Sequence, residues 1–430
     1  MDIVTAALLI ALLIAVLASG FWIGLALLGV AVFAMEVFTS RPVGDSMVFT
    51  IWGSTSNWTL TALPLFLWMG EILFRSRLTA DLFKGLAPWL NHVPGRLLHA
   101  NVIGCGIFAA VSGSSAATCA TIGKITLPEL KQRGYPDAIS LGSLAGAGTF
   151  GLMIPPSIIM IVYGVATDTS ISKLFVAGIV PGLLLMALFS GYLVVWALRH
   201  PGQVPAADAA TSLMDKLRAA RHLGPVVSLI ALVIGAIYSG VATATESAAL
   251  GVAGSLLLSR WEGTLTWPAL KDGLASACRV YCMIGLILAG ASFLTLAMGF
   301  IGLPREVAAF IGQLHLSPFG LLMLLMAFFI VLGCFLDGIS MVVLTMAVLL
   351  PTVQAAGIDL VWFGIYVVLV VEMAQITPPV GFNLFVLQGL TQRELPELAR
   401  MALPFFGLLV LAVLLIWVFP QSVLWLPSLM

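Results

Sequence analysis

The chain has 430 residues, of which 61% are apolar and only 9% are charged. A water-soluble protein carries about 25% charged residues, so this composition excludes a soluble enzyme, a nucleic-acid-binding protein and a disordered regulator. Lysine plus arginine and aspartate plus glutamate both number 19, so no basic surplus is present to attract phosphate groups.

The first predicted element is an apolar helix over residues 3–19. A secretory signal peptide has a positive charge before its apolar core, and none precedes this run, so we interpret it as a retained membrane helix. A second helix is expected to end near Phe38, and a third to run from about Trp58 to Phe74. Since one pass takes about 20 apolar residues, the chain has room for roughly a dozen.

Two stretches have the spacing of an amphipathic helix that lies along the membrane surface. In residues 78–96 the apolar side chains fall on one stripe, with Asp81 and Lys84 off it. Residues 301–316 repeat this pattern. We therefore predict two interfacial helices.

Each predicted interfacial helix is followed by an apolar region with a polar interruption. The first region, Leu98–Ile125, is interrupted at Ser112–Ser115, and the second, Phe319–Pro351, at Asp337-Gly338. The halves are short for crossing a bilayer. We therefore predict two re-entrant hairpins whose tips lie at membrane depth inside protein, where non-helical backbone is tolerated.

Two further apolar stretches end in the only Pro-Pro pairs of the chain, Pro155-Pro156 and Pro378-Pro379. Proline lacks a backbone donor and clashes with the preceding turn, so each pair is expected to break a membrane helix. Such breaks leave carbonyl and amide groups directed into a cavity.

These helix breakers recur at one offset, which indicates an internal repeat. The hairpin tips Ser114 and Asp337 are 223 positions apart, as are Gly134 and Gly357 and the two Pro-Pro pairs. We interpret the repeated unit as an amphipathic arm, a hairpin and a broken helix.

The distribution of basic residues predicts that the two copies have opposite topology. Lys124, Lys131 and Arg133 follow the first hairpin, whereas residues 352–360 after the second contain no lysine or arginine. By the positive-inside rule, the first turn is cytoplasmic and the second is on the other side. Residues 199–222 and the segment with Arg393 and Arg400 are also predicted to be cytoplasmic.

Inverted repeats with broken helices are typical of a secondary transporter whose site lies at the bilayer midplane. Carbonyl groups at unwound turns suit a dehydrated Na⁺, and the N-termini of half-helices suit an anionic substrate. The chain contains no Walker A sequence, so ATP hydrolysis is not expected.

Several polar residues in apolar surroundings are candidates for this chemistry. Ser112–Ser115 place three hydroxyl groups and a glycine at one tip, although serine also serves helix packing. Asp337 is ionisable within an apolar run, with helix capping as the alternative. Glu372 could pair with the broken helix, help to bind a cation or carry a proton, and the Asn383 amide could meet a ligand.

Other polar groups have simpler interpretations. Glu246 is expected to be an acid favoured by a helix N-terminus, and Arg279 an interfacial anchor. The five cysteines are odd in number and lie in apolar runs. We interpret them as buried free thiols and not as a disulfide framework.

Four stretches resemble the large membrane subunit of tripartite ATP-independent periplasmic (TRAP) transporters. They are residues 112–123 (SGSSAATCATIG), 151–157 (GLMIPPS), 243–249 (TATESAA) and 372–386 (EMAQITPPVGFNLFV). The similarity runs in order over nearly the whole chain. One departure is Ala244, where the family more often has proline between the two threonines.

This resemblance implies an all-α inner-membrane protein with an elevator-type fold of the ion transporter superfamily. It implies Na⁺-coupled uptake of an organic acid, such as a C4-dicarboxylate or sialic acid, that a periplasmic binding protein delivers. It also implies a small membrane subunit of about four helices, expected here as a separate polypeptide.

The resemblance places Na⁺ at the hairpin tips and helix breaks. The expected Na⁺ ligands are Ser114, Ser115, Gly151, Ile154, Pro155, Asp337, Gly338, Thr377 and Pro378. The expected substrate contacts are Ser114, Ser115, Pro156, Asp337, Pro379, Gly381 and Asn383. Asp337→Ala and Ser115→Ala are each expected to abolish transport while the protein still inserts.

The chain is accordingly divided into scaffold and transport parts. We predict scaffold helices in 1–77, an arm in 78–96, the first transport repeat in 97–180, scaffold helices and a cytoplasmic loop in 181–300, a second arm in 301–316, the second transport repeat in 317–400 and a C-terminal helix in 401–430.

Three other functions are compatible with parts of this pattern. The nearest is a stand-alone Na⁺- or H⁺-coupled di- or tricarboxylate carrier of the same superfamily, which would need no binding protein. An intramembrane enzyme needs a convergent nucleophile–base or metal set, and the chain has neither GxSxG nor HExxH. A passive channel is not favoured, since broken inverted repeats indicate alternating access.

Overall fold

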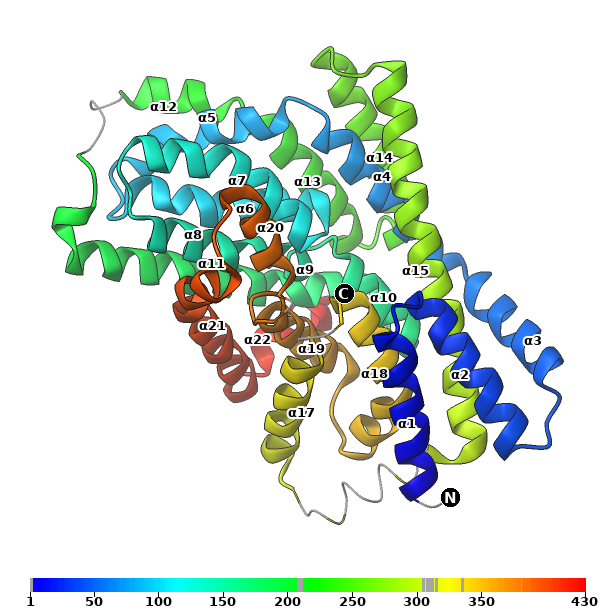
Figure 1. The fold of residues 1–430 in the computed structure, drawn as a ribbon. Coiled ribbons are helices and arrows are strands. Elements are labelled where there is room, and N and C mark those ends of the chain that lie inside the picture. The colour runs from blue at the N-terminus through cyan, green and yellow to red at the C-terminus, as the bar shows by residue number, and fades with distance from the viewer. Residues whose placement is uncertain are drawn as a thin grey trace.

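In the computed structural model, every regular element of the described residues is a helix (Figure 1). The structure describes residues 3–206, 212–303, 306, 313, 316–333, 336–379 and 381–430. The prediction of an all-α fold is therefore confirmed.

The N-terminal helices lie where the apolar runs placed them, with one addition. The two predicted helices are α1 (Ile3–Ala18) and α2 (Ile23–Phe38). The third span begins as a short 3₁₀ turn, Trp58–Thr61, and continues as α4 (Ala62–Phe74). The sequence analysis missed α3 (Val43–Thr55), which contains no fully buried residue and packs on the core only through partly buried side chains such as Val43 and Met47.

The first predicted amphipathic stretch forms a helix, α5 (Leu78–Leu90), which packs against α6, α7 and α12. Its position along the membrane surface stays a prediction. Most of the second, predicted over 301–316, lies outside the described residues.

Both hairpins form with their turns at the predicted polar interruptions. The first consists of α6 (His99–Ser112) and α7 (Ser115–Gln132). The second consists of α17 (Pro318–Gly333) and α18 (Gly338–Ala355). Figure 1 shows the first in the upper part of the view and the second in the lower part.

Both Pro-Pro pairs interrupt helices, as predicted. In the first repeat α8 (Asp137–Gly148) and α9 (Phe150–Met153) precede the break, and α10 (Ile158–Thr167) follows it. The axis bends there by 42°. In the second repeat α19 (Leu360–Gln375) precedes the break and α20 (Phe382–Thr391) follows it. The Pro155-Pro156 and Pro378-Pro379 bonds are both cis.

The hairpin of each repeat packs against a broken helix of the other repeat. Helix α7 of the first hairpin packs on α20 of the second repeat, and α18 of the second hairpin packs on α10 of the first. The C-terminal ends of the hairpin helices also correspond, since Gly134 and Gly357 follow them with φ values of +81° and +70°. Each hairpin therefore packs against the broken helix of the other repeat as well as against that of its own.

The remaining helices complete the outer parts of the bundle. They are α11 (Ile171–Arg199), α12 (Leu213–Ala220), α13 (Gly224–Tyr238), α14 (Ala244–Trp261), α15 (Trp267–Ile301), α21 (Leu395–Val418) and α22 (Gln421–Leu424). Within the described residues, α11, α15 and α21 are single helices long and apolar enough to cross a bilayer. Helix α15 packs along α2, α3 and α4 on one side of the molecule (Figure 1).

Local side-chain chemistry explains where α14 begins. The Thr243 hydroxyl accepts a bond from the Glu246 backbone N–H at 3.3 Å, and the Glu246 carboxylate accepts one from the Thr243 N–H at 2.8 Å. This capping box satisfies two otherwise unpaired donors. Glu246 therefore has the helix-starting role that was predicted.

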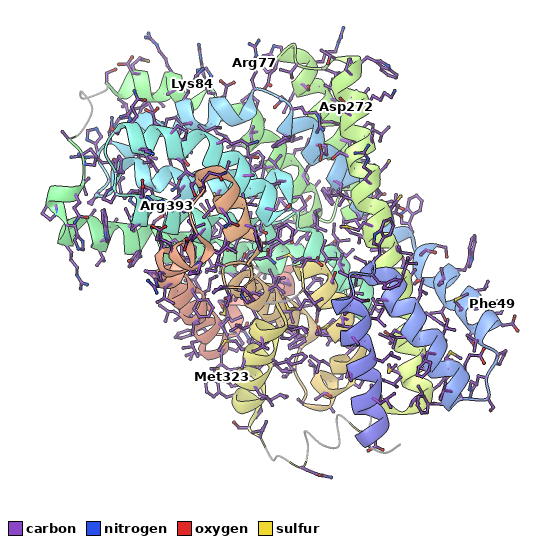
Figure 2. The ribbon with its side chains drawn as sticks, viewed as in Figure 1. Phe49, Arg77, Lys84, Asp272, Met323 and Arg393 are labelled. Carbon is purple, nitrogen blue, oxygen red and sulfur yellow. The ribbon has the colours of Figure 1, made fainter. Side chains whose placement is uncertain are left out.

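Several charged side chains lie along one edge of the molecule. In Figure 2, Arg77, Lys84 and Asp272 lie along the upper edge, whereas Phe49 lies at the right edge and Met323 in the lower part. Helix α15 carries Cys278 and Cys282, which are exposed, so the prediction of buried thiols is wrong for these two. Cys105 and Cys119 are buried as expected, and Cys334 lies outside the described residues.

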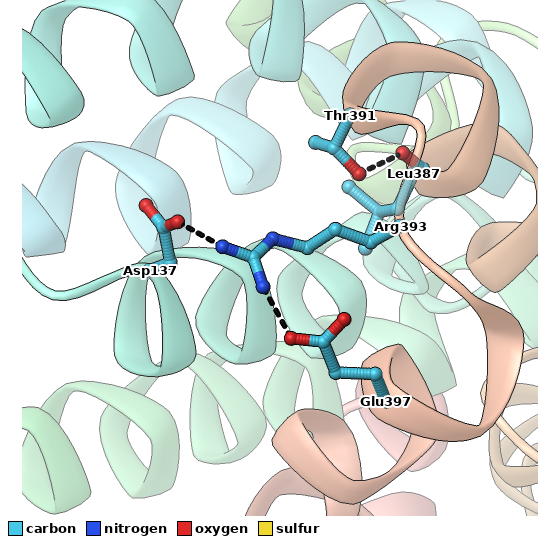
Figure 3. A network of polar contacts seen from close by, with 5 residues as sticks. All are labelled: Asp137, Leu387, Thr391, Arg393 and Glu397. Carbon is cyan, nitrogen blue, oxygen red and sulfur yellow. Dashed lines mark hydrogen bonds and ion pairs between the residues drawn. The ribbon is translucent and has the colours of Figure 1, made fainter.

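A charged network joins the two repeats at one face of the bundle (Figure 3). Arg393, between α20 and α21, pairs with Asp137 at the start of α8 and with Glu397 in the first turn of α21. The hydrogen bond to Asp137 raises the pKa of Arg393, which stays charged. The turn after the first hairpin and the segment after the second break therefore lie on the same side, in agreement with the charge asymmetry.

We expect Arg393→Gln to lower stability only modestly. The three side chains are 33–44% exposed, and exposed pairs of this kind contribute about 0.2–1 kcal/mol each. Thermal unfolding of the purified protein should show a drop of a few degrees at low salt that shrinks at high salt, because salt screens exposed charges. A loss that does not depend on salt would contradict an electrostatic role.

Candidate cation and substrate site

The first hairpin tip is held by its own cap and by the break of its own repeat. Gly113 ends α6 in the left-handed region at φ +59°, and Ser114 is the N-cap of α7, where its side chain accepts from the Ala117 N–H at 3.5 Å. The Gly113 carbonyl accepts from the Ile158 N–H at 3.4 Å, just beyond Pro155-Pro156. A Cβ at Gly113 would lie 2.8 Å from the Pro156 carbonyl oxygen.

Gly151 on α9 packs directly against this tip. A Cβ there would overlap the carbonyl group of Ser114 and lie 2.7 Å from the Ser115 nitrogen. The fold therefore brings Ser114, Ser115, Gly151 and Pro156 together, as the sequence predicted. The side chain of Ile154 packs instead toward Gly106 and Gly182 of the neighbouring helices, so only its backbone could serve as a ligand.

At the second tip, Asp337 is the N-cap of α18. Its Oδ2 atom accepts from the backbone N–H groups of Ile339 and Ser340 at 3.1 and 3.3 Å, and the Ser340 hydroxyl bonds to its other oxygen. Gly338 packs between Val371 and Ile159. The capping alternative is therefore realised, and a role of Asp337 or Gly338 in cation binding stays a prediction.

The second helix break is a tight turn. The Thr377 hydroxyl donates to the Met373 carbonyl at 2.7 Å, and the Thr377 carbonyl accepts from the Gly381 N–H at 3.0 Å. A Cβ at Gly381 would lie 2.9 Å from that carbonyl oxygen, so the turn has no space for one. The geometry leaves backbone carbonyls as the polar groups available at the turn.

The two breaks differ in accessibility. Pro155 and Pro156 are buried beneath the first tip, whereas Pro378 and Pro379 are exposed. The first Pro-Pro pair is therefore enclosed by protein, whereas the second lies at the surface of the described residues.

Asn383 is the predicted contact whose environment differs most from expectation. Its side chain is fully buried, and its amide nitrogen donates to the Ala145 carbonyl on α8 at 3.1 Å. The donor is therefore used to join α20 to α8. Among the described residues, none bonds to its Oδ1 atom. A substrate contact at Asn383 remains a prediction.

Sequence reasoning missed Gln375, the last residue of α19. Its Oε1 atom accepts a hydrogen bond from the Ser115 hydroxyl at 3.5 Å, although the two residues are 260 positions apart. Nothing in the local sequence distinguishes Gln375 from a residue that ends a helix. Only the fold shows that it touches the first tip.

Glu372 is fully buried on α19, beside the peptide group of Met153. Within the described part of the chain, no hydrogen-bond partner satisfies either carboxyl oxygen. The Met153 backbone belongs to the first broken helix, so pairing of the carboxyl group with that helix stays open beside cation binding and proton transfer.

We expect Glu372→Gln to fold and transport nearly as the parent does, and Glu372→Ala to be destabilised. An ionised carboxylate is very costly to bury without a partner, whereas the amide fills the same volume without a charge. Truncation to alanine leaves a cavity, which typically lowers the free energy of unfolding by about 2–5 kcal/mol. Unfolding in detergent and uptake should be measured together. A well-folded Gln variant without uptake would show that the carboxylate itself is required.

Taken together, the tips and breaks offer hydroxyl and carbonyl oxygens and the N-termini of α7 and α18. The described residues contain no group of three or more His, Cys, Asp or Glu side chains placed for a metal ion. Neutral oxygens suit a hard cation, and two helix N-termini suit a carboxylate. Arg279 on α15 is exposed, and its role as an interfacial anchor stays a prediction.

Comparison with known proteins gives consistent matches over the whole fold. Residues 10–422 match the family model "Tripartite ATP-independent periplasmic transporter, DctM component". The C4-dicarboxylate TRAP transporter large permease protein of Pseudomonas aeruginosa is 32% identical over 391 residues, covering 89% of each chain. The ectoine/5-hydroxyectoine TRAP large permease of Ruegeria pomeroyi is 34% identical and covers 86% of each.

Among solved structures, the YdaH transporter of Alcanivorax borkumensis superposes with a TM-score of 0.63 at 14% identity. The match covers 95% of this chain and 96% of that one. At this identity the likeness concerns the fold alone, and it supports the arrangement of hairpins and broken helices.

Proposed function

This chain belongs to the family of DctM components of TRAP transporters, and on that premise we propose that it moves an organic acid into the cell by symport with Na⁺. As a large permease subunit, it is an integral inner-membrane protein that works with a small membrane subunit and a periplasmic binding protein. The comparisons agree on transport permeases and not on one substrate.

The observation that carries the proposal is the meeting of both hairpin tips with both helix breaks. Ser114 and Ser115 lie against Gly151, and Ser115 also reaches Gln375 at the second break. Gly338 lies beside the same Gln375 side chain. Such a cluster of carbonyl and hydroxyl oxygens, with two helix N-termini nearby, fits a site for Na⁺ and a carboxylate.

Na⁺ binding and substrate binding are coupled if both ligands favour the same arrangement of the hairpin tips. An ion held between a tip and a break fixes the helix N-terminus that faces the substrate. Each ligand then raises the affinity of the other by the same factor. We propose that this linkage lets the Na⁺ gradient drive uptake, by an elevator movement of the hairpins and broken helices against the scaffold.

The test is uptake into proteoliposomes that contain this chain and its small-subunit partner. Succinate, a C4-dicarboxylate, is the first probe, and sialic acid the second. An inward Na⁺ gradient is imposed with and without the cognate periplasmic binding protein. We expect uptake that needs both Na⁺ and the binding protein.

Other outcomes would change the proposal in defined ways. Uptake with Na⁺ but without the binding protein would favour the stand-alone carrier, which the matches to TRAP large permeases do not favour. Uptake that is indifferent to Na⁺ would remove the ion assignment at Ser114, Ser115 and Asp337. Protons would then be the coupling ion to test, with Glu372 as the first residue.

A further inference from the structure

The internal repeat gives each residue near the site a counterpart. Ser114 and Asp337 cap α7 and α18, so Ser115 and Gly338 are equivalent first residues of these helices. They mark the same point on the two hairpin tips.

One side chain lies between these two equivalent points. The Ser115 hydroxyl donates to Gln375 Oε1 at 3.5 Å, and a Cβ at Gly338 would lie 3.5 Å from Gln375 Nε2. The Gln375 side chain is only 6% exposed, so water does not replace these contacts freely. The Gln375 amide therefore lies between the two tips, with its oxygen bonded to the first tip and its nitrogen next to Gly338 of the second.

The bridge is made by one repeat only. The counterpart of Gln375, 223 positions earlier, is Leu152, which has no polar side-chain atom. If only packing mattered, leucine could occupy both positions 152 and 375. The polar side chain of Gln375 therefore breaks the symmetry at the point where the tips meet.

We propose that Gln375 couples the two hairpin tips, so that cation binding at one tip raises the affinity for a cation at the other. This inference rests on the proposed Na⁺ symport. A serine hydroxyl that binds a cation uses its oxygen lone pairs and must donate its hydrogen elsewhere. Gln375 Oε1 is the acceptor in place at the first tip.

The physical sequence of events follows from these contacts. A cation at the first tip orients the Ser115 hydroxyl toward Gln375 and so fixes the amide. The other end of the amide then lies against the first turn of α18, where the second cation is predicted. Because coupling between two sites is reciprocal, a cation at the second tip strengthens binding at the first by the same factor.

The test measures binding of ²²Na⁺ to the complete purified transporter, without an organic substrate and at constant ionic strength. For the parent protein we expect a sigmoidal curve with a Hill coefficient above 1. In Gln375→Leu we expect a hyperbolic curve and a half-saturating Na⁺ concentration raised at least about fivefold, the lower end of usual coupling. Gln375→Met, which is unbranched, serves as a second variant if leucine disturbs the fold.

Gln354→Leu is the matched control, because Gln354 is exposed near the far end of α18 and should leave the curve unchanged. Cooperative binding that survives in folded Gln375→Leu and Gln375→Met would overturn the coupling role and leave Na⁺ symport intact. A Hill coefficient of 1 in the parent protein would also overturn the coupling role of Gln375 and leave Na⁺ symport intact. A parent protein that binds no ²²Na⁺ would overturn both proposals.

Discussion

Replacing Gly151 by alanine is expected to abolish Na⁺-driven uptake while the protein still inserts and folds. The added Cβ would overlap the Ser114 carbonyl group and lie 2.7 Å from the Ser115 nitrogen, whereas ordinary contacts begin at 3.4 Å. Both neighbours are backbone, so no side chain can rotate away. Since the nearest distance is 2.4 Å, the first tip would have to move by about 1 Å to restore an ordinary contact.

A displacement of this size is large for a site that works through fixed oxygen positions. Misplacement by about 1 Å can cost about a hundredfold in rate where geometry decides the outcome, so we expect uptake to fall at least that far. The second repeat has a similarly close approach with the roles exchanged. There a Cβ at Gly333 on the hairpin would overlap Ala374, the counterpart of Gly151.

The matched control is Gly191→Ala on α11, where an added Cβ meets nothing within 4 Å. Alanine is favoured over glycine inside a helix by roughly 0.5–1 kcal/mol, so this variant should be at least as stable and should transport normally. Uptake should be compared at equal amounts of protein in the membrane. Normal uptake by Gly151→Ala would show that the tip can move without consequence.

The main architecture was predictable because it depends on residues with strong local effects. Proline removes a backbone hydrogen-bond donor wherever it lies. A polar turn inside an apolar run cannot face lipid, so it must lie inside protein or beside a water-filled cavity. The polar turns of both hairpins and both Pro-Pro breaks are therefore found in the sequence at their observed positions. The offset of 223 positions also relates Ser114 to Asp337 through the order of residues alone.

The features that could not be predicted are those that depend on which face of a helix packs against the rest of the protein. In a membrane protein both faces are apolar, so sequence alone did not show that Cys278 and Cys282 are exposed. The same uncertainty applies to Asn383, whose distance from the break was clear but whose side chain packs toward α8. The Ser115–Gln375 contact spans 260 positions and leaves no local signal.

Three substitutions at Asp337 are expected to separate helix capping from cation binding. Asparagine keeps an oxygen that can accept from the Ile339 and Ser340 N–H groups. Serine copies Ser114, the cap at the equivalent position of α7. Alanine removes the cap, which typically costs about 0.5–2 kcal/mol. Only the alanine variant should therefore lose much stability.

The three substitutions should affect uptake in a different order from their effects on stability. If Asp337 helps to hold Na⁺, its negative charge is the property that matters, and asparagine, serine and alanine should all lose Na⁺-driven uptake by a large factor. The charge also favours the N-terminus of α18, but that effect is only about 0.3–1 kcal/mol and cannot explain such a loss. Thermal unfolding and initial uptake rates at several Na⁺ concentrations distinguish the two roles. Near-normal uptake in the asparagine and serine variants would mean that Asp337 acts as a cap alone, and the second cation would then have to be held by backbone carbonyls near Gly338 and Thr377.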